Sequence, residues 1–380
     1  MPSFPYWRLS SYYFFYFAFV GAFSPYWSLY LKSLYFSASE IGVLMSLLMV
    51  TRIFAPTLWG WLADRSGKRV GIVQSAAACS LASYLGVFFG KSFWWLFGVM
   101  ALLSFFWSAS LPLVEATTLS HLGDSTARYG RVRLWGSVGF IIAVVGIGYV
   151  LDVTEIHVLL WLVMGLMSGI LVFSRYIPEA EIVLHHTDQL PVSQILKRPE
   201  VAVLFAACFL MVAAHGPFYT FYSLYLVAHG YSKGAIGWLW ALGVICEIAV
   251  FISMPRIMYR FSIPQILGAS FSLAVIRFLL IGWLVDSAAA ILFAQMLHAA
   301  TFGSYHAAAI AAIHHFFRGR HQAKGQALYT SLTFGAGGTF GALMSGYSWD
   351  FLGANLTFSI ASLFALLGLL LIGWKFRLKT

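Results

Sequence analysis

Five charged residues stand inside long apolar stretches of the sequence: Arg52, Glu115, Arg133, Glu247 and Arg277. A charged side chain at the centre of a membrane-spanning helix costs about 2.5–3.5 kcal/mol even on the lenient insertion scale, so it faces a partner or a water-filled cavity. Burial raises the pKa of a carboxyl group and a neighbouring arginine lowers it, so a carboxyl group under both influences can bind and release a proton. Arginine can hold a carboxylate through two hydrogen bonds. These residues therefore predict binding of an organic acid and movement of a proton, with a purely structural ion pair as the alternative.

The loop after the second apolar stretch carries another pattern of polar residues. Two glycines, an acid and a basic run occur there in the order Gly60-Trp61-Leu62-Ala63-Asp64-Arg65-Ser66-Gly67-Lys68-Arg69. Glycine permits a tight turn, and the basic run favours the cytoplasmic side of a membrane. We expect a short cytoplasmic loop here.

The elements that must position these residues are membrane-spanning helices. Of the 380 residues, 61% are hydrophobic and 9% are charged, whereas a soluble domain carries about 25% charged residues. Apolar runs of about 20 residues recur, each long enough to cross the ~30 Å hydrocarbon layer. They are continuous rather than alternating, which favours helices over a barrel. We predict an all-α membrane protein with twelve transmembrane helices at 9–33, 38–63, 70–90, 93–120, 129–151, 157–177, 201–228, 233–255, 264–284, 288–315, 324–348 and 355–375.

The basic residues set the expected orientation of these helices. With both termini in the cytoplasm, most of the 23 Lys and Arg residues fall in cytoplasmic loops, and only Lys32, Lys91 and Lys233 fall in loops on the opposite side. Membrane insertion favours this asymmetry. We therefore attribute the net charge of +10 to membrane orientation and not to nucleic-acid binding.

The two halves of the sequence repeat. Ser-Leu-Tyr-Leu occurs at 28–31 and again at 223–226, an offset of 195 residues (223 − 28) that also relates Arg52 to Glu247. The offset spans six helices, so matching helices have the same orientation, as in the parallel halves of major facilitator transporters. We predict two pseudo-symmetric six-helix bundles, 1–177 and 201–380, joined by a cytoplasmic linker at 178–200, with Arg52 and Glu247 facing a central cavity.

The loop pattern resembles the cytoplasmic signature of the major facilitator superfamily. In that family the acid contacts the other half near the eleventh helix and stabilises the outward-open state. The resemblance implies a conformational gating role for Gly60, Asp64, Arg65, Gly67, Lys68 and Arg69. The second half keeps only Arg260 of this pattern, with Tyr259 in place of the acid.

The charged residues also resemble those of lactose permease-type proton symporters. That resemblance implies substrate binding by Glu115 and Arg133 and a coupling role for Arg277 and His298. Those symporters carry a glutamate one turn beyond the histidine, where this sequence has Thr301. Glu247 and Glu115 are therefore the expected proton carriers.

A closer resemblance, covering nearly the whole chain, is to the phenylpropionate permease-like branch of the superfamily. It rests on the motifs Pro25-Tyr26-Trp27-Ser28, Tyr129-Gly130-Arg131-Val132-Arg133-Leu134-Trp135-Gly136-Ser137-Val138, Ala214-His215, Gly237-Trp238-Leu239-Trp240-Ala241-Leu242-Gly243-Val244 with Glu247, and Leu297-His298 with Thr301 and His306. The branch implies proton-linked uptake of a small aromatic carboxylate across a bacterial inner membrane.

Aromatic and histidine side chains complete the set of candidates. Trp27, Trp240 and His215 are expected to bind substrate and His298 to take part in proton coupling, with ordinary packing or a structural hydrogen bond as the alternative for each. The paired histidines at 185–186 and 314–315 lack companion ligands at metal spacing. No nucleophile–base pair or nucleotide-binding loop is present in the sequence. We predict no metal, no cofactor and no enzymatic activity.

These observations predict a monomeric secondary transporter that moves a small molecule with a proton by alternating access. The arginines favour an aromatic carboxylate of the phenylpropionate kind. A sugar or nucleoside symporter is the alternative, and a transport-inactive receptor or sensor represents a different class. The direction of transport stays open.

Overall fold

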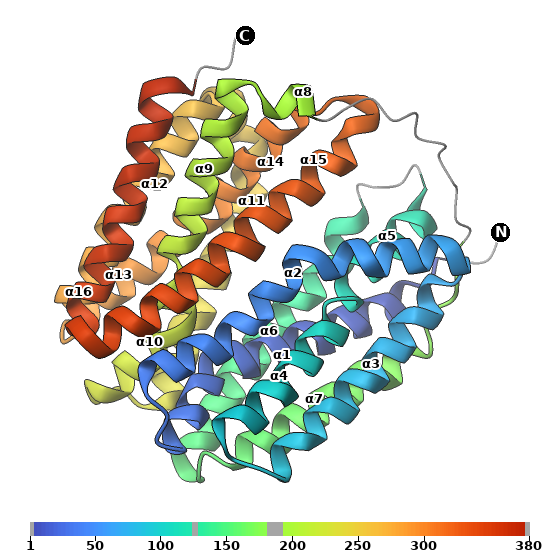
Figure 1. The fold of residues 1–380 in the computed structure, drawn as a ribbon, viewed down its shortest axis with the longest axis vertical. Coiled ribbons are helices and arrows are strands. Elements are labelled where there is room, and N and C mark those ends of the chain that lie inside the picture. The colour runs from blue at the N-terminus through green and yellow to red at the C-terminus, as the bar shows by residue number, and fades with distance from the viewer. Residues whose placement is uncertain (1–3, 124–127, 181–192, 377–380) are drawn as a thin grey trace. The chain divides into compact units, whose positions relative to one another are not determined.

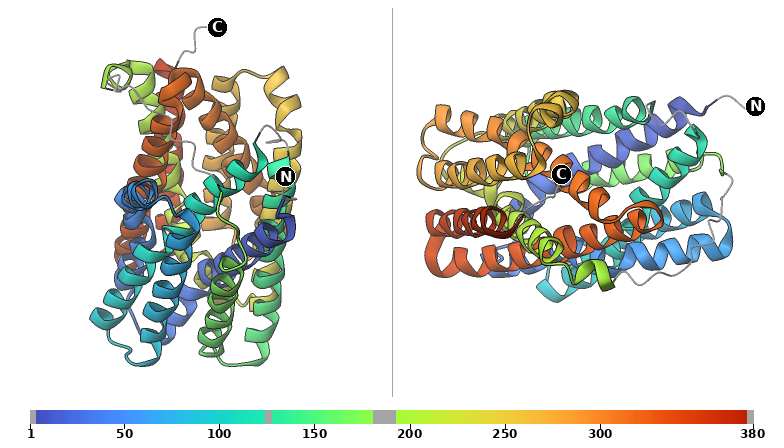
Figure 2. Two further views of the ribbon diagram at one scale, coloured as in Figure 1. Left: turned by 90° about the vertical axis from the view of Figure 1, so that its right-hand side faces the viewer. Right: turned by 90° about the horizontal axis from the view of Figure 1, so that it is seen from above.

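The computed structural model describes residues 4–123, 128–180 and 193–376. Helices make up almost all of these ranges, and they contain no strand (Figures 1 and 2). Residues 181–192, which form most of the predicted linker and include the histidine pair at 185–186, lie outside the described ranges.

The first half contains the six predicted spans, with ends within a few residues of expectation. They are α1 (Tyr6–Ser33), α2 (Ala38–Ser66), α3 (Arg69–Leu85) continued by η1 (Gly86–Phe88), α4 (Phe93–Trp107) followed by α5 (Ser110–Leu122), α6 (Tyr129–Val153) and α7 (Val158–Ser174).

The second half follows the same plan with more interruptions. It comprises α8 (Ser193–Leu196), α9 (Pro199–Ala214), α10 (Gly216–Ala228), α11 (Lys233–Arg260), α12 (Ile263–Trp283), α13 (Ala288–His298), η3 (Ala299–Ser304), α14 (Tyr305–Phe316), η4 (Gly319–His321), α15 (Gln322–Tyr329), η5 (Thr330–Gly337) and α16 (Gly338–Lys375). Gly353 interrupts α16 with φ 81° and ψ 177°, which separates the last two spans.

Eight helical stretches in the described ranges are long and apolar enough to cross a membrane. One of them, Gln322–Trp374, has 53 residues and contains the break at Gly353, so it supplies two spans. The helix α7 has 17 residues, and α1 is rich in tyrosine and serine, which lower its hydropathy. With α1, α7 and the continuous segment from α13 to α14, the twelve predicted spans are accounted for.

Two spans are broken near prolines. The helix α9 ends at Ala214, and α10 begins at Gly216 with Pro217 in its first turn. The same kind of break separates α4 from α5 just before Pro112. Proline has no N–H to donate and its ring collides with the preceding turn, so a helix restarts there more easily than it continues.

Two further spans contain π-helical turns, η3 and η5. A π-turn widens the helix locally and is frequently found at functional sites. The first, η3, directly follows His298 and contains Thr301.

The chain forms two compact units. Unit 1 comprises Met1–Phe36, Phe54–His186 and Ser232–Trp238, and unit 2 comprises Ser37–Ile53, Thr187–Tyr231 and Leu239–Thr380. Two helices are thus divided between the units: α2 between Ile53 and Phe54, and α11 between Trp238 and Leu239. The predicted division into 1–177, 178–200 and 201–380 stays a prediction.

Close helix packing holds each unit together. In unit 1, α1 packs against α6 and α7, and a side chain on Gly139 would collide with the Phe14 backbone. In unit 2, α16 packs against α9 and α12 (Figure 1), and Gly216 lies against the backbone of Gly341. Small residues allow such close approach between helices in a membrane.

An aspartate caps the start of each shared helix. In unit 1, the Asp152 carboxylate accepts hydrogen bonds from the backbone N–H groups of Lys233 and Gly234 at 2.7 and 2.9 Å. In unit 2, Asp350 accepts from Ala38 and Ser39 at 3.0 and 2.7 Å. A carboxylate satisfies the unpaired N–H groups and the positive dipole end of a helix N-terminus.

Candidate functional site

Unit 1 holds an ion pair between Glu115 on α5 and Arg133 on α6. The Arg133 Nε lies 3.7 Å from Glu115 Oε1, and the two side chains are 31% and 35% exposed. The Tyr129 hydroxyl donates a hydrogen bond of 3.1 Å to the same carboxylate oxygen. The structure therefore brings together the two residues that the sequence predicted as substrate ligands, and it leaves both accessible.

The Arg133 guanidinium stacks on an aromatic ring. Its central carbon lies 3.8 Å from the centre of the Phe17 ring and 5.8 Å from that of Tyr13, both on α1. A cation over a ring face is attracted by the π-electrons. Gly136, one turn beyond Arg133, leaves the space for this stack, because a side chain there would collide with Phe17.

Unit 2 holds another arginine of the predicted set, Arg277 on α12, in a different setting. Its side chain is 0% exposed. The guanidinium donates to the Ala294 carbonyl at 3.0 Å, to Thr301 Oγ1 at 3.2 Å and to Gln295 Oε1 at 3.3 Å. It also lies 4.2 Å from the centre of the Phe218 ring. None of the ion pairs in the described ranges includes Arg277.

His215 completes the surroundings of Arg277. Its Nδ1 lies 2.8 Å from the Met211 carbonyl oxygen and its Nε2 lies 3.3 Å from Arg277 Nη1. A carbonyl can only accept, so Nδ1 carries the hydrogen and Nε2 is left to accept from the arginine. In this structure neutral His215 accepts a hydrogen bond from Arg277. This is the structural hydrogen bond that was the alternative to substrate binding for this histidine.

Glu247 on α11 and His298 at the end of α13 lie close together in unit 2. The His298 Nε2 is 4.0 Å from Glu247 Oε2, and the side chains are 8% and 17% exposed. The buried Nδ1 of His298 has no hydrogen-bond partner within the described part of the chain. Two glycines make room for the pair: Gly243 faces the His298 ring and Gly303 faces the Glu247 side chain.

Tyr219 on α10 links the charged residues of unit 2. It lies within electrostatic reach of Glu247, Arg277 and Arg52, and its ring contacts His215 and Trp240. Arg52 on α2 is half-buried. The structure thus assigns Arg52 and Glu247 to the same unit, and the expectation that both face a central cavity stays a prediction.

The two predicted aromatic ligands are buried. Trp27 is 0% exposed, donates from Nε1 to the sulfur of Met100 at 3.3 Å and stacks on Phe23. Trp240 is 5% exposed and donates to Ser223 Oγ at 3.1 Å. Both packings match the alternative weighed from the sequence, and contact with substrate stays a prediction for each.

The predicted gating loop is mostly helical: Gly60, Asp64 and Arg65 lie in the last turns of α2, Arg69 begins α3, and only Gly67 and Lys68 connect the two helices. Gly67 has φ 67°, a conformation that glycine adopts without strain, and its N–H donates to the Ala63 carbonyl at 3.0 Å. Arg69 donates to Ser120 Oγ at 3.1 Å, and Arg65 lies over the Trp61 ring. Asp64 and Lys68 are exposed, and Gly60 has open space around its Cα.

Sequence reasoning missed several polar partners in these clusters. Gln295 was not singled out, although an amide inside an apolar span is a usable signal because it needs partners there. It accepts from Arg277 and donates to the Leu239 carbonyl at 3.1 Å. Tyr129 and Phe17 carry no comparable signal, since aromatic residues are frequent throughout the chain. Within the described ranges, no group of three potential ligands could hold a metal ion.

Comparisons with known proteins agree with this architecture. The profile of the MFS_1 like family matches residues 6–360. The probable 3-phenylpropionic acid transporter of Escherichia coli (strain K12) is 28% identical over 365 residues, which cover 92% of each chain. The maltose permease of Geobacillus stearothermophilus is also 28% identical, over 96% of this chain and 94% of its own.

Solved structures share the fold. The nucleoside transporter NupG, as a D323A mutant, superposes with a TM-score of 0.87 over 98% of this chain and 99% of its own, at 17% identity. A bacterial homologue of the human lysosomal transporter Spinster, in an inward-facing conformation, gives a TM-score of 0.72 over 97% of each chain, at 14% identity. These relatives and neighbours are transporters and not enzymes. With its helical repeat and its buried charges, the chain belongs to the MFS_1-like family and is a membrane transporter with the twelve-helix major facilitator fold.

Proposed function

We propose that this transporter takes up a small aromatic carboxylate together with a proton. The Glu115–Arg133 pair is the observation that carries the proposal. It offers an arginine that is accessible, stacked on an aromatic ring and balanced by one carboxylate. A phenylpropionate-like acid has a carboxylate for Arg133 and a ring for the aromatic side chains beside it.

The pair supplies a coupling mechanism. A substrate carboxylate competes with Glu115 for Arg133, because both are anionic ligands of one guanidinium. When Glu115 takes up a proton, its attraction for Arg133 falls and the substrate carboxylate takes its place. Release of the substrate returns Arg133 to Glu115, which then loses the proton. One proton thus accompanies one monoanion, and this exchange moves no net charge.

Glu247 and His298 form a second candidate site for the proton. A carboxyl and an imidazole 4.0 Å apart can hold one proton between them, and the fixed positive charge of Arg277 lies in the same unit. We propose Glu247 as the carrier there and His298 as its partner. A second proton would add one charge to each cycle, worth about 2.3 kcal/mol per 100 mV of membrane potential.

The relative named as a probable 3-phenylpropionic acid transporter supports this choice of substrate. The test is uptake of 3-phenylpropionate into proteoliposomes that contain the purified protein. We expect an inward pH gradient to drive accumulation with the membrane potential clamped at zero. Glu115→Gln should bind the substrate with the same affinity across the pH range, whereas wild-type affinity should fall as pH rises. Uptake that ignores the pH gradient would overturn the proposal.

A neutral sugar is the second candidate substrate, favoured by the maltose permease, which has the same sequence identity of 28%. Uptake of maltose into the same proteoliposomes distinguishes the two candidate substrates. Saturable maltose uptake with no response to 3-phenylpropionate would show that the substrate is a sugar. The absence of transport for acids, sugars and nucleosides, despite binding, would favour a receptor.

We further propose that the protein is a monomer in a bacterial inner membrane, with both termini cytoplasmic and with Asp64 acting as the gate residue. Thiol labelling tests the orientation. The variant Lys197→Cys, made together with Cys79→Ser, should react with an impermeant thiol reagent only after the membrane is opened. A cysteine at Lys91→Cys is the matched control and should react in intact cells. The reverse pattern would contradict the proposed orientation.

A further inference from the structure

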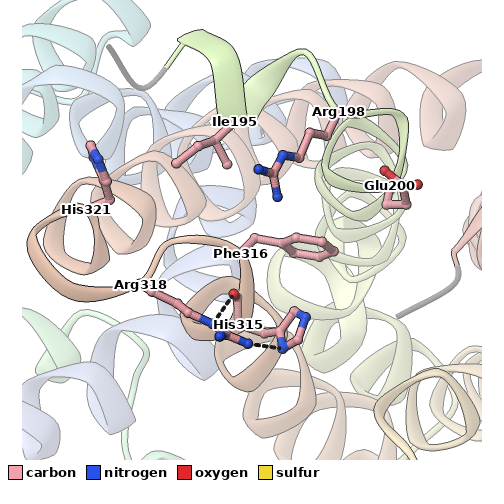
Figure 3. A pocket seen from close by; sticks show the side chains of 7 residues that line it. All are labelled: Ile195, Arg198, Glu200, His315, Phe316, Arg318 and His321. Carbon is pink, nitrogen blue, oxygen red and sulfur yellow. Dashed lines mark hydrogen bonds between the residues drawn. The ribbon is translucent and has the colours of Figure 1, made fainter. Parts of the chain in front are cut away.

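A cavity of about 570 Å³ lies in unit 2 where α9 begins and α14 ends (Figure 3). Its lining residues come from α8, the loop before α9, the first turn of α9, the end of α14, the loop after α14 and η4. They are Ile195, Arg198, Glu200, His315, Phe316, Arg318 and His321. None of them belongs to the candidate transport residues, so the cavity needs an explanation of its own.

The lining is rich in cationic and hydrogen-bond-donating groups. Figure 3 shows the Arg198 guanidinium pointing toward Phe316, with Arg318 and His315 below it. Glu200 also lines the cavity, yet none of the ion pairs in the described ranges joins it to Arg198 or to Arg318. Two guanidinium groups therefore line one cavity, and no carboxylate among the described residues is bound to either.

The position of Arg318 is fixed by its neighbour. Its Nε donates to the His315 carbonyl at 3.2 Å, and one Nη lies 3.4 Å from His315 Nδ1. These contacts use one edge of the planar guanidinium and leave its other N–H groups available to a ligand. The buried Nδ1 of His321 has no hydrogen-bond partner among the residues described.

The start of α9 adds to the positive potential. Arg198 is its N-cap residue, and no side chain caps the helix. The dipole of a helix N-terminus attracts anions. Here the N–H groups of Val201 and Ala202 already donate to the Arg198 carbonyl, and Glu200 places one carboxylate in the first turn. The two guanidinium groups therefore supply most of the attraction for an anion, and the Phe316 ring gives the cavity an apolar wall.

We propose that this cavity binds a phosphate group. Phosphate offers several acceptor oxygens to converging donors, and arginine binds it through paired hydrogen bonds. The group can come from an anionic phospholipid, because basic pockets at the ends of membrane-spanning helices bind such headgroups. It can also come from a soluble phosphate compound, so the experiment must separate these two sources.

The experiment measures thermal unfolding of the full-length protein in a neutral detergent. The probes are phosphatidylglycerol, phosphatidylcholine and inorganic phosphate. We expect phosphatidylglycerol to raise the unfolding midpoint and phosphatidylcholine to leave it unchanged, since binding to the folded state alone stabilises it. A rise with inorganic phosphate as well assigns the site to soluble phosphate compounds, and a rise with phosphatidylglycerol alone assigns it to the lipid headgroup.

Variants locate the effect. Arg198→Gln with Arg318→Gln should weaken binding about tenfold or more for each guanidinium removed. Arg198→Lys with Arg318→Lys keeps both charges without the fork and should give an intermediate loss. Lys197→Gln with Arg260→Gln removes the same number of charges from exposed positions outside the cavity and should bind as the wild type does.

Native mass spectrometry of phosphatidylglycerol retained on each variant gives a second measurement that does not depend on unfolding. Retention in the wild type and the control, with loss in the glutamine pair, supports the site. Equal retention in all variants, or no response of the wild type to either net anionic probe, phosphatidylglycerol or inorganic phosphate, overturns it.

Discussion

Arg133 and Arg277 solve the same physical problem in opposite ways. Both lie within apolar spans, but Arg133 is 31% exposed and faces a carboxylate, whereas Arg277 is 0% exposed and faces neutral acceptors from three residues and one backbone carbonyl. A ligand can exchange with a single half-exposed partner. It cannot readily replace four buried ones, because each displaced acceptor would lose its hydrogen bond.

The difference separates two roles for buried charge. The pair in unit 1 is suited to a switch, since one protonation changes what Arg133 binds. The cluster in unit 2 is suited to a fixed positive charge that holds α12, α13 and η3 together and acts on Glu247 and His298 nearby. Of the predicted arginine ligands for a carboxylate, Arg133, Arg277 and Arg52, the geometry favours Arg133 over Arg277.

The largest expected effect concerns folding. Arg277→Met should lower the free energy of unfolding by at least about 3 kcal/mol, because several buried acceptors lose their donor. Arg133→Met should cost about 0–1 kcal/mol, as expected for a partly exposed ion pair. Thermal unfolding of both purified variants measures the contrast, and equal midpoints would remove the distinction between a fixed and a switchable arginine.

The reverse order is expected for substrate binding. Arg133→Gln should weaken binding of 3-phenylpropionate about tenfold to a hundredfold, since it removes charged hydrogen bonds to the carboxylate. Arg133→Lys should lie between this variant and the wild type, because lysine keeps the charge without the planar fork. Calorimetric titration measures the affinities. Wild-type affinity in Arg133→Gln would rule out this residue as the carboxylate ligand.

The pair formed by Glu247 and His298 allows the two units to be compared by their part in proton coupling. If the coupling proton travels through Glu247 and not through Glu115, Glu247→Gln should abolish accumulation driven by a pH gradient while exchange of substrate across the membrane continues, because the amide cannot carry a proton. Glu155→Gln is the control, since Glu155 is 83% exposed and pairs with His157 outside the spans. If gradient-driven accumulation survives in Glu247→Gln, the proton travels through Glu115 alone.

The smallest effect is expected at Asp64, which lies outside both clusters. A contact between this carboxylate and a helix terminus is worth about 0.3–1 kcal/mol, so Asp64→Asn should slow transport about twofold to fivefold and leave substrate affinity unchanged. Asp286→Asn, at a residue that is 84% exposed and bonded to His229, is the matched control. A parallel loss of binding and transport would point to a direct or structural role for Asp64.

Sequence alone predicted the class of protein and the approximate positions of the spans, and its motifs predicted the family. The class and the spans follow from hydropathy, which depends on composition within about 20 residues and not on what surrounds the helix. It also singled out Glu115 and Arg133, because a charge in an apolar span demands a partner. Pro112 and Pro217 stand next to the two broken helices and are visible in the sequence, but the π-turns of η3 and η5 leave no comparable mark in the sequence.

Only the tertiary structure decided which partner each charge has. Whether Arg277 faces an acid, a substrate or neutral groups depends on the rotation of α12 and on its neighbours α13 and η3, and these contacts bring together residues distant in the sequence. The same holds for Trp27, whose type suits a binding pocket as well as a core and which is fully buried. A residue's chemistry is local, whereas its exposure and its partners are properties of the packed helices, and those properties distinguish an arginine that can exchange ligands from one that cannot.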